Sequence, residues 1–345
     1  MCLYNFRSFP INLSISFVLL TYLTVLSISA EKPNILFISV DDLRPELGCY
    51  GVNYAQSPNI DQFAKTAVTF RNHYVQVSTC GASRYALLTG RSPAKSGALK
   101  NNVFYSGKTA IKNKQLPGAQ TMPELFRRSG YRTVLIGKIS HTPDGKVFSY
   151  NGKGDGKLEM PRAWNHLATP MGKWKRGWPL FFAYAGGKHR EDGRKQMELM
   201  EFITEHDDEL PDGLLAESAI SQLNQLKEQG ENFLMGLGFF KPHLPFVAPK
   251  QDWEAFEKTN IPAPLNNKSF DSPYKHDSGE FFKYSTPYEI KKPLDPESAI
   301  MAKRAYLACV RYIDRQIGKV LLHLEKIDLV KNTIVVIWGD HGWHL

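Results

Sequence analysis

Four short apolar segments are spread along the chain, and they restrict the possible folds more than any other feature. The segments are 32–42 (KPNILFISVDD), 131–138 (YRTVLIGK), 232–240 (NFLMGLGFF) and 332–341 (NTIVVIWGDH). Near-continuous apolar runs are typical of strands buried on both faces of a sheet. Helical patterns lie between them, at 57–67, after Cys80, at 121–130, at 214–229 and from about Pro296 to Lys326. This alternation predicts an α/β fold in which a mostly parallel sheet is sandwiched between helices.

Polar side chains follow each of the four predicted strands. The carboxyl ends of parallel strands meet at one edge of a sheet, and ligands bind at that edge. The residues concerned are Asp41 and Asp42, Lys138 and His141, Lys241 and His243, and Asp340 and His341. Packing does not explain acids, bases and cations at four strand ends, so the sequence predicts a functional site there.

Three carboxylates and one imidazole in this set suggest a metal ion. Taken alone, Asp41 and Asp42 would be interpreted as part of a solvated loop. Asp340 and His341 follow another strand in the same way, and this favours a metal site instead. Carboxylate oxygens are hard ligands that suit Ca²⁺ or Mg²⁺ better than zinc.

The first thirty residues differ from the rest of the chain. They carry one charge, Arg7, within an apolar and hydroxyl-rich stretch that ends in SISA. This pattern predicts a secretory signal peptide over residues 1–30, and the alternative is an uncleaved membrane anchor. No later segment approaches the roughly 18 apolar residues that span a bilayer. We therefore expect a secreted or periplasmic protein, lysosomal in a eukaryote, with residues 31–345 as a single catalytic domain.

The net charge of the chain is +9, and it becomes +8 when Arg7 is lost with the signal peptide. An exported basic protein fits an acidic partner: nucleic acid, an anionic surface or a polyanionic glycan. Charge alone does not choose among these partners.

Cysteine usage adds a further constraint. Beyond residue 30 the chain has Cys49, Cys80 and Cys309, so at least one thiol is left without a disulfide partner. Cys80 is the thiol in the most polar setting. It is either a small buried residue or half of a disulfide, or else the precursor of a catalytic group.

The segment 80–84 (CGASR), followed by 88–91 (LTGR), resembles the sulfatase signature C-x-P-S-R-x-x-x-L-T-G-R. The resemblance implies that a maturase, of the formylglycine-generating or the radical type, oxidises Cys80 to formylglycine. One hydroxyl of the hydrated aldehyde would attack sulfur, and the other would then expel sulfate. Arg84 is expected to hold the oxygens of the nucleophile by charge-assisted hydrogen bonds. Ala82 stands where the family usually has proline, and maturation systems that accept C-x-A-x-R are known for the family.

Similarity to the iduronate-2-sulfatase branch of this family extends over essentially all of the chain after residue 30, as in 238–246 (GFFKPHLPF). It implies an alkaline-phosphatase-like fold and one bound calcium ion. The implied calcium ligands are Asp41, Asp42, Asp340 and His341, together with residue 80. Lys138 is expected to grip the sulfate, His141 to assist the nucleophile and His243 to protonate the departing sugar oxygen. Lys241 and Trp343 are expected to face the substrate.

The expected function is hydrolysis of sulfate esters of a sulfated acidic polysaccharide. Two alternatives stay open. One is a phosphatase or phosphodiesterase of the same superfamily, although such enzymes usually carry Thr or Ser where this chain has Cys80. The other is a catalytically impaired homologue that binds sulfated glycan. Neither nucleic acid nor, after signal cleavage, a membrane is expected as a partner.

Two expectations concern the long segments and the end of the sequence. Residues 142–212 and 246–294 are rich in glycine, proline, lysine and aromatic residues, and loops of this length are usually functional. Within the first, 172–178 (GKWKRGW) either grips a sulfated sugar or forms an ordinary solvated loop. The resemblance also leads us to expect a further sulfate-binding lysine and a smaller antiparallel subdomain beyond Leu345, so that the C-terminal subdomain is missing from this sequence.

Overall fold

The structure is a computed structural model, and it describes residues 32–193, 197–263, 279–284 and 294–342. The predicted signal peptide, residues 1–30, and the predicted substrate-facing Trp343 lie outside the described residues. The sheet and the site both belong to one compact unit, which begins at Asn34.

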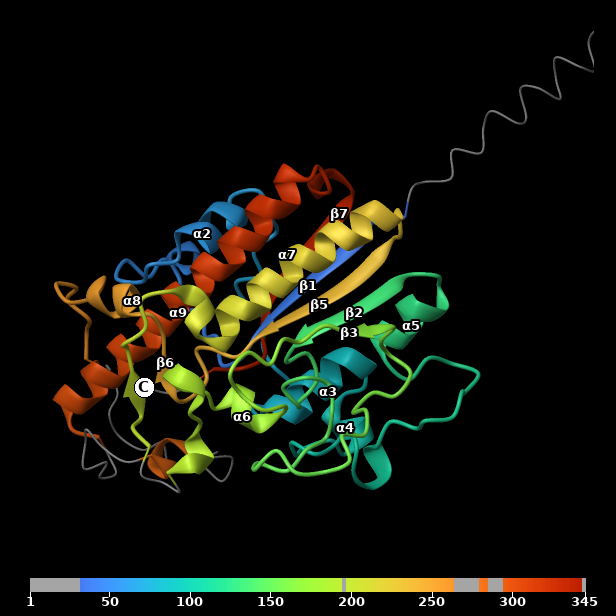
Figure 1. The fold of residues 1–345 in the computed structure, drawn as a ribbon, viewed down its shortest axis with the longest axis horizontal. Helices are drawn as coiled ribbons and strands as arrows, with labels where there is room; N and C mark the ends of the chain where they lie inside the picture. The colour runs from blue at the N-terminus through green and yellow to red at the C-terminus, as the bar shows by residue number, and fades with distance from the viewer. Residues whose placement is uncertain (1–31, 194–196, 264–278, 285–293, 343–345) are drawn as a thin grey trace, which may run out of the picture. The chain divides into compact units, whose positions relative to one another are not determined.

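A parallel sheet of five strands, in the order β3-β2-β5-β1-β7, forms the centre of this unit (Figure 1). The strands are β1 (Asn34–Val40), β2 (Arg132–Gly137), β3 (His166–Leu167), β5 (Phe233–Phe239) and β7 (Thr333–Gly339). Ile38 of β1 lies opposite Leu237 of β5 on one side and Ile337 of β7 on the other. The four predicted strands are therefore neighbours, which confirms the expected parallel α/β sheet, and the short β3 extends it beyond β2.

Helices cover both faces of the sheet, as the sequence predicts. They are α2 (Pro58–Ala64), α3 (Cys80–Thr89), α4 (Pro93–Ser96), α5 (Met122–Arg128), α6 (Trp178–Phe181), α7 (Pro211–Gln229), α8 (Lys250–Glu254) and α9 (Pro296–Lys326). Short 3-10 helices lie at Gly48–Tyr50, Gly107–Thr109, Ala185–Gly187, Arg190–Asp192, Asp207–Glu209, Glu280–Lys283 and Val330–Asn332. A separate two-stranded parallel sheet pairs β4 (Met200–Glu201) with β6 (Phe246–Val247).

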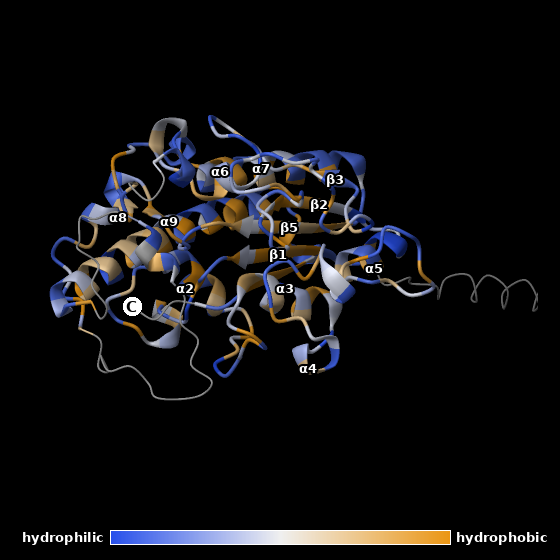
Figure 2. Cartoon of the chain, turned by 90° about the horizontal axis from the view of Figure 1, so that it is seen from below, coloured by the Kyte–Doolittle hydropathy of each residue, from blue (hydrophilic) through white to orange (hydrophobic). Residues whose placement is uncertain are grey.

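The alternation of side chains along the strands separates two hydrophobic cores. Leu36 and Ile38 of β1 belong to the core that contains α7 and α9, whereas Phe37 belongs to the core that contains Tyr85 and Leu88 of α3. Figure 2 shows α7 on one side of the strands and α3 and α5 on the other. Because successive residues of a strand face opposite sides, a strand buried on both faces must be apolar throughout.

The aromatic residues of the segment 172–178 are largely buried. Trp174 and Trp178 are 4% and 5% exposed and belong to the larger core. The indole nitrogen of Trp174 donates to the backbone carbonyls of Tyr184 and Lys188, at 3.0 Å each. Lys173 and Lys175, on either side of Trp174, are exposed. The expected contact of this segment with a sulfated sugar stays a prediction.

A close approach of two strands at their carboxyl ends requires glycine. A Cβ atom on Gly137 would lie 2.0 Å from the carbonyl oxygen of Gly238, and the φ angle of Gly137 is 73°, a left-handed conformation that favours glycine. The backbone N–H of Lys138 donates to the same carbonyl. The end of β2 is thereby fixed against β5, which positions Lys138 at the site.

Two smaller expectations can also be compared with the structure. Cys49, Cys80 and Cys309 are all free thiols, so no disulfide joins the cysteines that the structure describes. Within the described ranges, no helix combines the length and the apolar character that crossing a membrane requires.

Candidate active site

The residues predicted from the four strand ends converge at the carboxyl edge of the sheet. The possible metal ligands form three groups, and within each group the donor atoms lie within 4.8 Å of one another. The groups are Asp41, Asp42 and Asp340; Asp42, Cys80 and His341; and Asp41, Cys80 and His243. Cys80 joins them because it is the first residue of α3, which packs on the sheet just beneath this edge.

Cys80 is held at the centre of the cluster by the first turn of α3. Its sulfur lies 3.0 Å from Nε2 of His341. The next residue, Gly81, donates its N–H to the side chain of Asn101 at 2.9 Å, and Ser83 donates its hydroxyl to the carbonyl of Asp340 at 2.6 Å. Burial, with the nearby Asp41 carboxylate, raises the pKa of the Cys80 thiol to about 12. An unmodified thiol at this position is therefore protonated at neutral pH and is a weak nucleophile.

Arg84, one turn along α3, organises the carboxylates. Its guanidinium lies fully buried, 2.8 Å from Asp340 and 3.1 Å from Asp41, and it also donates to the backbone carbonyls of Lys138 and Ile139. Burial alone would lower the pKa of Arg84, but the two carboxylates raise it. The structure thus gives Arg84 four acceptors within the cluster, and its expected contact with the oxygens of the nucleophile stays a prediction.

Lys138 forms a third buried ion pair in the cluster, with Asp41. Its ammonium lies 2.5 Å from Oδ2 of Asp41 and 4.2 Å from the ring centre of Phe181. Burial would lower the pKa of Lys138, but Asp41 raises it above its ordinary value. Conversely, burial would raise the pKa of Asp41, but Lys138 and Arg84 lower it far below its ordinary value. Both groups are therefore charged at neutral pH.

Asp42 has an unusual backbone conformation that brings its side chain into the cluster. Its φ angle is 62°, which is uncommon for a residue other than glycine. The N–H of Asp42 donates to Oδ1 of Asp340 at 2.9 Å, and its carbonyl accepts from the hydroxyl of Tyr306 on α9 at 3.0 Å. These two contacts, made by β7 and α9, hold the strained residue in place.

The carboxylate of Asp42 provides the test of whether a cation fits the site. Nδ1 of His341 lies 2.9 Å from Oδ1, and Nε2 of His243 lies 3.8 Å from Oδ2. Yet neither oxygen, although buried, accepts a hydrogen bond of good geometry from the described residues. Buried carboxylates are normally satisfied. The donor atoms of Asp42 group with those of Asp41, Asp340, Cys80 and His341, so these oxygens fit a hard divalent cation.

The two histidines face this cluster differently. His141 is 5% exposed, its ring centre lies 5.0 Å from that of Trp178, and its Nδ1 accepts or donates no hydrogen bond among the described residues. Burial and the positive charge of Lys138 hold the pKa of His141 well below its ordinary value, so the ring is neutral. His243 has its Nδ1 2.7 Å from the carbonyl of Leu244, which leaves Nε2 on the side of Asp42 and Glu280.

Lys241 holds the turn that carries His243. Its ammonium is buried and donates to the carbonyls of His243 at 3.0 Å and Pro245 at 2.6 Å. The predicted contact of Lys241 with a substrate stays a prediction. Burial lowers the pKa of Lys241. The same turn is fixed from outside by Asp212 at the start of α7, whose carboxylate accepts from the N–H of Phe240 at 2.6 Å.

Sequence reasoning missed three residues that support the site: Asn101, Asp212 and Glu159. Glu159 is 1% exposed and accepts from both the N–H and the hydroxyl of Thr142, which fixes the residue next to His141. All three lie outside the strand ends and act across long stretches of sequence. Isolated acidic or amide residues give no local signal of such contacts.

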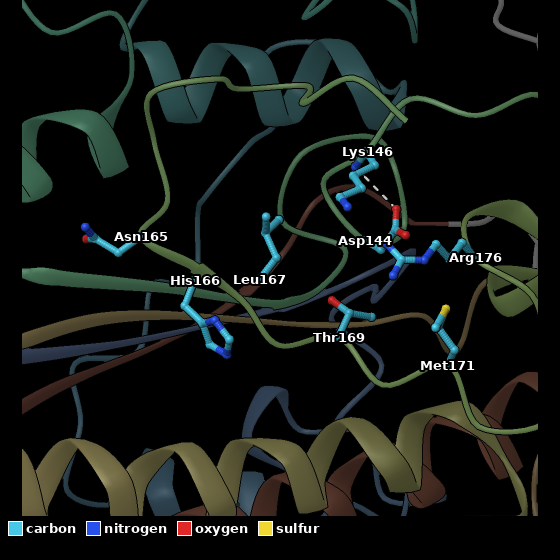
Figure 3. Close-up of a pocket in the computed structure, with 8 residues that line it drawn as sticks. All are labelled: Asp144, Lys146, Asn165, His166, Leu167, Thr169, Met171 and Arg176. Carbon is cyan, nitrogen blue, oxygen red and sulfur yellow. Dashed lines mark hydrogen bonds between the residues drawn. The ribbon is translucent and has the colours of Figure 1, made fainter. Parts of the chain in front are cut away.

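Two cavities lie close to the segment 142–158. One, of about 670 Å³, has His141 and Asn101 in its wall and therefore adjoins the cluster. The other, of about 340 Å³, lies beside the edge strand β3 and is lined by Asp144, Lys146, His166, Thr169 and Arg176, among others (Figure 3). In it, Oδ1 of Asp144 accepts from the backbone N–H of Lys146 at 3.3 Å.

Comparison with known proteins identifies the family. The Sulfatase family model matches residues 33–345. Iduronate 2-sulfatase of Mus musculus is 30% identical over 334 residues, which are 92% of this chain and 56% of that protein. A protein named Sulfatase from Formosa agariphila is 30% identical over 336 residues, covering 91% of this chain and 60% of the relative. The chain thus spans little more than half of the length of these relatives.

Solved structures share the fold at lower identity. Phosphonate monoester hydrolase of Agrobacterium radiobacter superimposes with a TM-score of 0.64 at 19% identity and covers 91% of this chain and 64% of its own. A protein solved with its substrate, D-glucosamine-2-N,6-O-disulfate, gives 0.59 at 21% identity, covering 91% and 66%. These likenesses confirm the expected alkaline-phosphatase-like α/β fold. Because the family model covers the whole sheet and every described residue of the cluster, this chain belongs to the sulfatase family.

Proposed function

We propose that this chain is the catalytic part of a sulfatase that hydrolyses sulfate esters with a nucleophile made from Cys80. The observation that carries the proposal is the position of Cys80, at the start of α3, with its sulfur 3.0 Å from His341 and close to the carboxylates of Asp41 and Asp42. Because the pKa of the thiol is about 12, oxidation of Cys80 to formylglycine by a maturase supplies what the thiol lacks, a hydroxyl nucleophile.

The residues present fit one divalent cation, and we propose calcium. Asp41, Asp42, Asp340 and His341 would hold it together with residue 80. A histidine that binds a metal ion is neutral, and with His341 neutral the three carboxylates outnumber the two buried cations that pair with them, Arg84 and Lys138. The cluster then retains negative charge for an ion. Oxygen-rich sites of this kind suit Ca²⁺ better than zinc. When bound, the cation supplies positive charge against the oxygens of the sulfate.

The cationic and neutral side chains divide the remaining work. Lys138, fixed by Asp41, presents an ammonium at the strand end where a sulfate oxygen binds. His141 is neutral, so it can accept the proton of the attacking hydroxyl. His243 is held at Nδ1 by the carbonyl of Leu244, with Nε2 on the side of Asp42 and Glu280, and donates a proton from Nε2 to the departing sugar oxygen.

The proposed substrate is a sulfated acidic polysaccharide, and the proposed setting is outside the cytoplasm. Relatives named iduronate 2-sulfatase, and a structural relative that binds a disulfated glucosamine, support a sulfated sugar. The net charge of +9 fits a polyanionic glycan. Residues 1–30 are proposed as a signal peptide for export, which places the protein in the periplasm or the secretory pathway, or in the lysosome of a eukaryote.

The test combines mass spectrometry with turnover. The chain is produced together with a formylglycine-generating maturase. The mass of the peptide that contains residue 80 is then determined by mass spectrometry, and the release of 4-methylumbelliferone from its sulfate ester is measured. We expect conversion of Cys80 and turnover, with both lost in Cys80→Ala and both kept in Cys49→Ala, a partly buried thiol outside the cluster. Converted protein that cleaves the matching phosphate ester but not the sulfate ester would show that the proposal is wrong.

A further inference from the structure

The cavity of about 670 Å³ adjoins the cluster through His141 and Asn101. His141, which faces the cluster, also forms part of the cavity wall. Asn101, another wall residue, accepts the N–H of Gly81, the residue after Cys80, at 2.9 Å. A Cβ atom on Gly81 would lie only 2.3 Å from the carbonyl oxygen of Asn101, so the wall is packed directly against the first turn of α3. The volume of about 670 Å³ lies within the usual range of ligand sites, roughly 300–1,000 Å³.

One side of this cavity is aromatic. Tyr105, Phe148, Tyr150 and Trp178 all line it. The ring centre of Trp178 lies 5.0 Å from that of His141 and 4.9 Å from that of Tyr150, so the aromatic surface is continuous from the cluster outward. Tyr150 is 50% exposed, and a ring in this position presents an apolar face together with a polar hydroxyl. Such a wall suits a sugar ring, which has apolar C–H faces and polar edges.

The loop 151–157 contributes positive charge. Lys153 and Lys157 line the cavity and are exposed, and neither forms an ion pair within the part of the chain that the structure describes. Asp155 is the one carboxylate in the cavity wall, and it accepts from the N–H of Lys157 at 3.1 Å. Asn151 likewise accepts from the N–H of Lys153 at 3.0 Å. The two lysines therefore stand on a loop with local hydrogen bonds, with an excess of one positive charge when His141 is neutral.

The smaller cavity lacks this combination. Burial raises the pKa of Asp144, and the cations of this cavity, Lys146 and Arg176, lie near that carboxyl and limit the rise. Their charge is thus partly balanced by the protein itself. Its wall also contains none of the residues of the cluster, so a sugar bound there would not place a sulfate at Cys80 (Figure 3).

We propose that the 670 Å³ cavity binds the sugar unit next to the sulfate that is removed, and that Lys153 and Lys157 bind a second anionic group, a carboxylate or a further sulfate, of the same glycan. This subsite rests on the proposed sulfatase function and adds to it a preference for substrates with more than one negative charge. The aromatic wall orients the sugar ring, and the two lysines favour substrates that carry a second negative charge.

The experiment compares two substrates in two double variants. Lys153→Ala/Lys157→Ala removes both cavity lysines, and Lys326→Ala/Lys331→Ala removes two exposed lysines that precede β7, at the opposite edge of the sheet. The substrates are 4-methylumbelliferyl sulfate, which has no second charge, and a disaccharide of heparin that carries a 2-O-sulfated uronate. An exposed ion pair contributes up to about 1 kcal/mol to binding, and the cavity variant loses two such pairs with the second anion. We therefore expect its KM for the disaccharide to rise about tenfold.

The expected pattern has three further parts. The kcat for the disaccharide and the turnover of the aryl sulfate stay unchanged, because only binding of the second anion is lost. Salt at about 0.5 M reduces the difference in KM for the disaccharide between the wild type and the cavity variant, because it screens exposed charges. The control variant matches the wild type on both substrates.

Two outcomes contradict the reasoning, and they are distinguishable. Normal turnover of the aryl sulfate with an unchanged KM for the disaccharide in the cavity variant overturns the subsite alone. If protein with converted residue 80 turns over neither substrate, the proposed function is wrong and the subsite falls with it.

Discussion

Substitution Arg84→Gln tests how much of the stability of the fold depends on the cluster. The guanidinium of Arg84 and the carboxylates of Asp41 and Asp340 are all 0% exposed. Removing one member of a buried ion pair typically costs about 3–5 kcal/mol, because the remaining charge stays buried without its partner. Lys138 still pairs with Asp41 in the variant, so Asp340 is the carboxylate that loses its charged partner. We therefore expect a loss of about 3–5 kcal/mol in the free energy of unfolding, and not twice that amount.

The measurement is urea denaturation of wild type and variant in EDTA at neutral pH, so that no bound cation compensates the lost charge. The control is Arg132→Gln, which removes an arginine whose partner Glu231 lies 3.9 Å away, with both side chains more than 40% exposed. Exposed pairs contribute about 0–1 kcal/mol. If Arg84→Gln lowers the free energy of unfolding by less than 1 kcal/mol, as the control should, the buried ion pairs do not stabilise the fold as argued here.

Three further predictions concern calcium, leaving-group protonation and pH. Calcium at one hundred times its Kd is expected to stabilise the folded protein by about 2.7 kcal/mol, which raises the melting temperature, and EDTA is expected to reverse this rise. An unchanged melting temperature would show that the metal assignment is wrong. His243→Ala should reduce turnover of sugar sulfates by about 10²–10⁴ while sparing an activated aryl sulfate, whose leaving group needs no proton. Equal losses on both substrates would exclude His243 as the acid. Asp212 is buried and its pKa is raised to about 6 from 3.8, so the folded state binds this proton more tightly and the stabilisation is lost as pH rises through 6. From pH 4 to 7 the free energy of unfolding of the wild type should fall by about 2.4 kcal/mol more than that of Asp212→Asn; equal pH dependence in urea denaturation would contradict this.

The parts of the structure that could be predicted from the sequence have local signals. The apolar runs mark the strands, and the polar residues that follow them mark the site, because parallel strands bring their carboxyl ends together. Cys80 was found by its motif and not by its surroundings. The signal for each of these features lies within a dozen neighbouring residues.

The parts that could not be predicted depend on contacts between distant segments. Lys241 follows a strand like Lys138, yet its ammonium turns back to the carbonyls of its own loop. Trp174 stands among exposed lysines in the sequence, yet its indole completes the hydrogen bonds of Tyr184 and Lys188. Asp212 supports a turn 28 positions away. In each case the side chain is long or polar enough for two roles, and only the folded chain selects between them.

The same long-range contacts link the chemistry to the stability of the sheet. The N–H of Asp42 donates to Oδ1 of Asp340 across 298 positions of sequence, and Arg84 joins Asp340 to Asp41. Asp340 in turn follows β7, the edge strand next to β1, where Ile334 and Val336 are 50% and 38% exposed. An edge strand that is half covered is held less firmly than the central strands β1 and β5. Any change that loosens β7 therefore acts on the cluster through Asp340, even when it lies far from Cys80 in the structure.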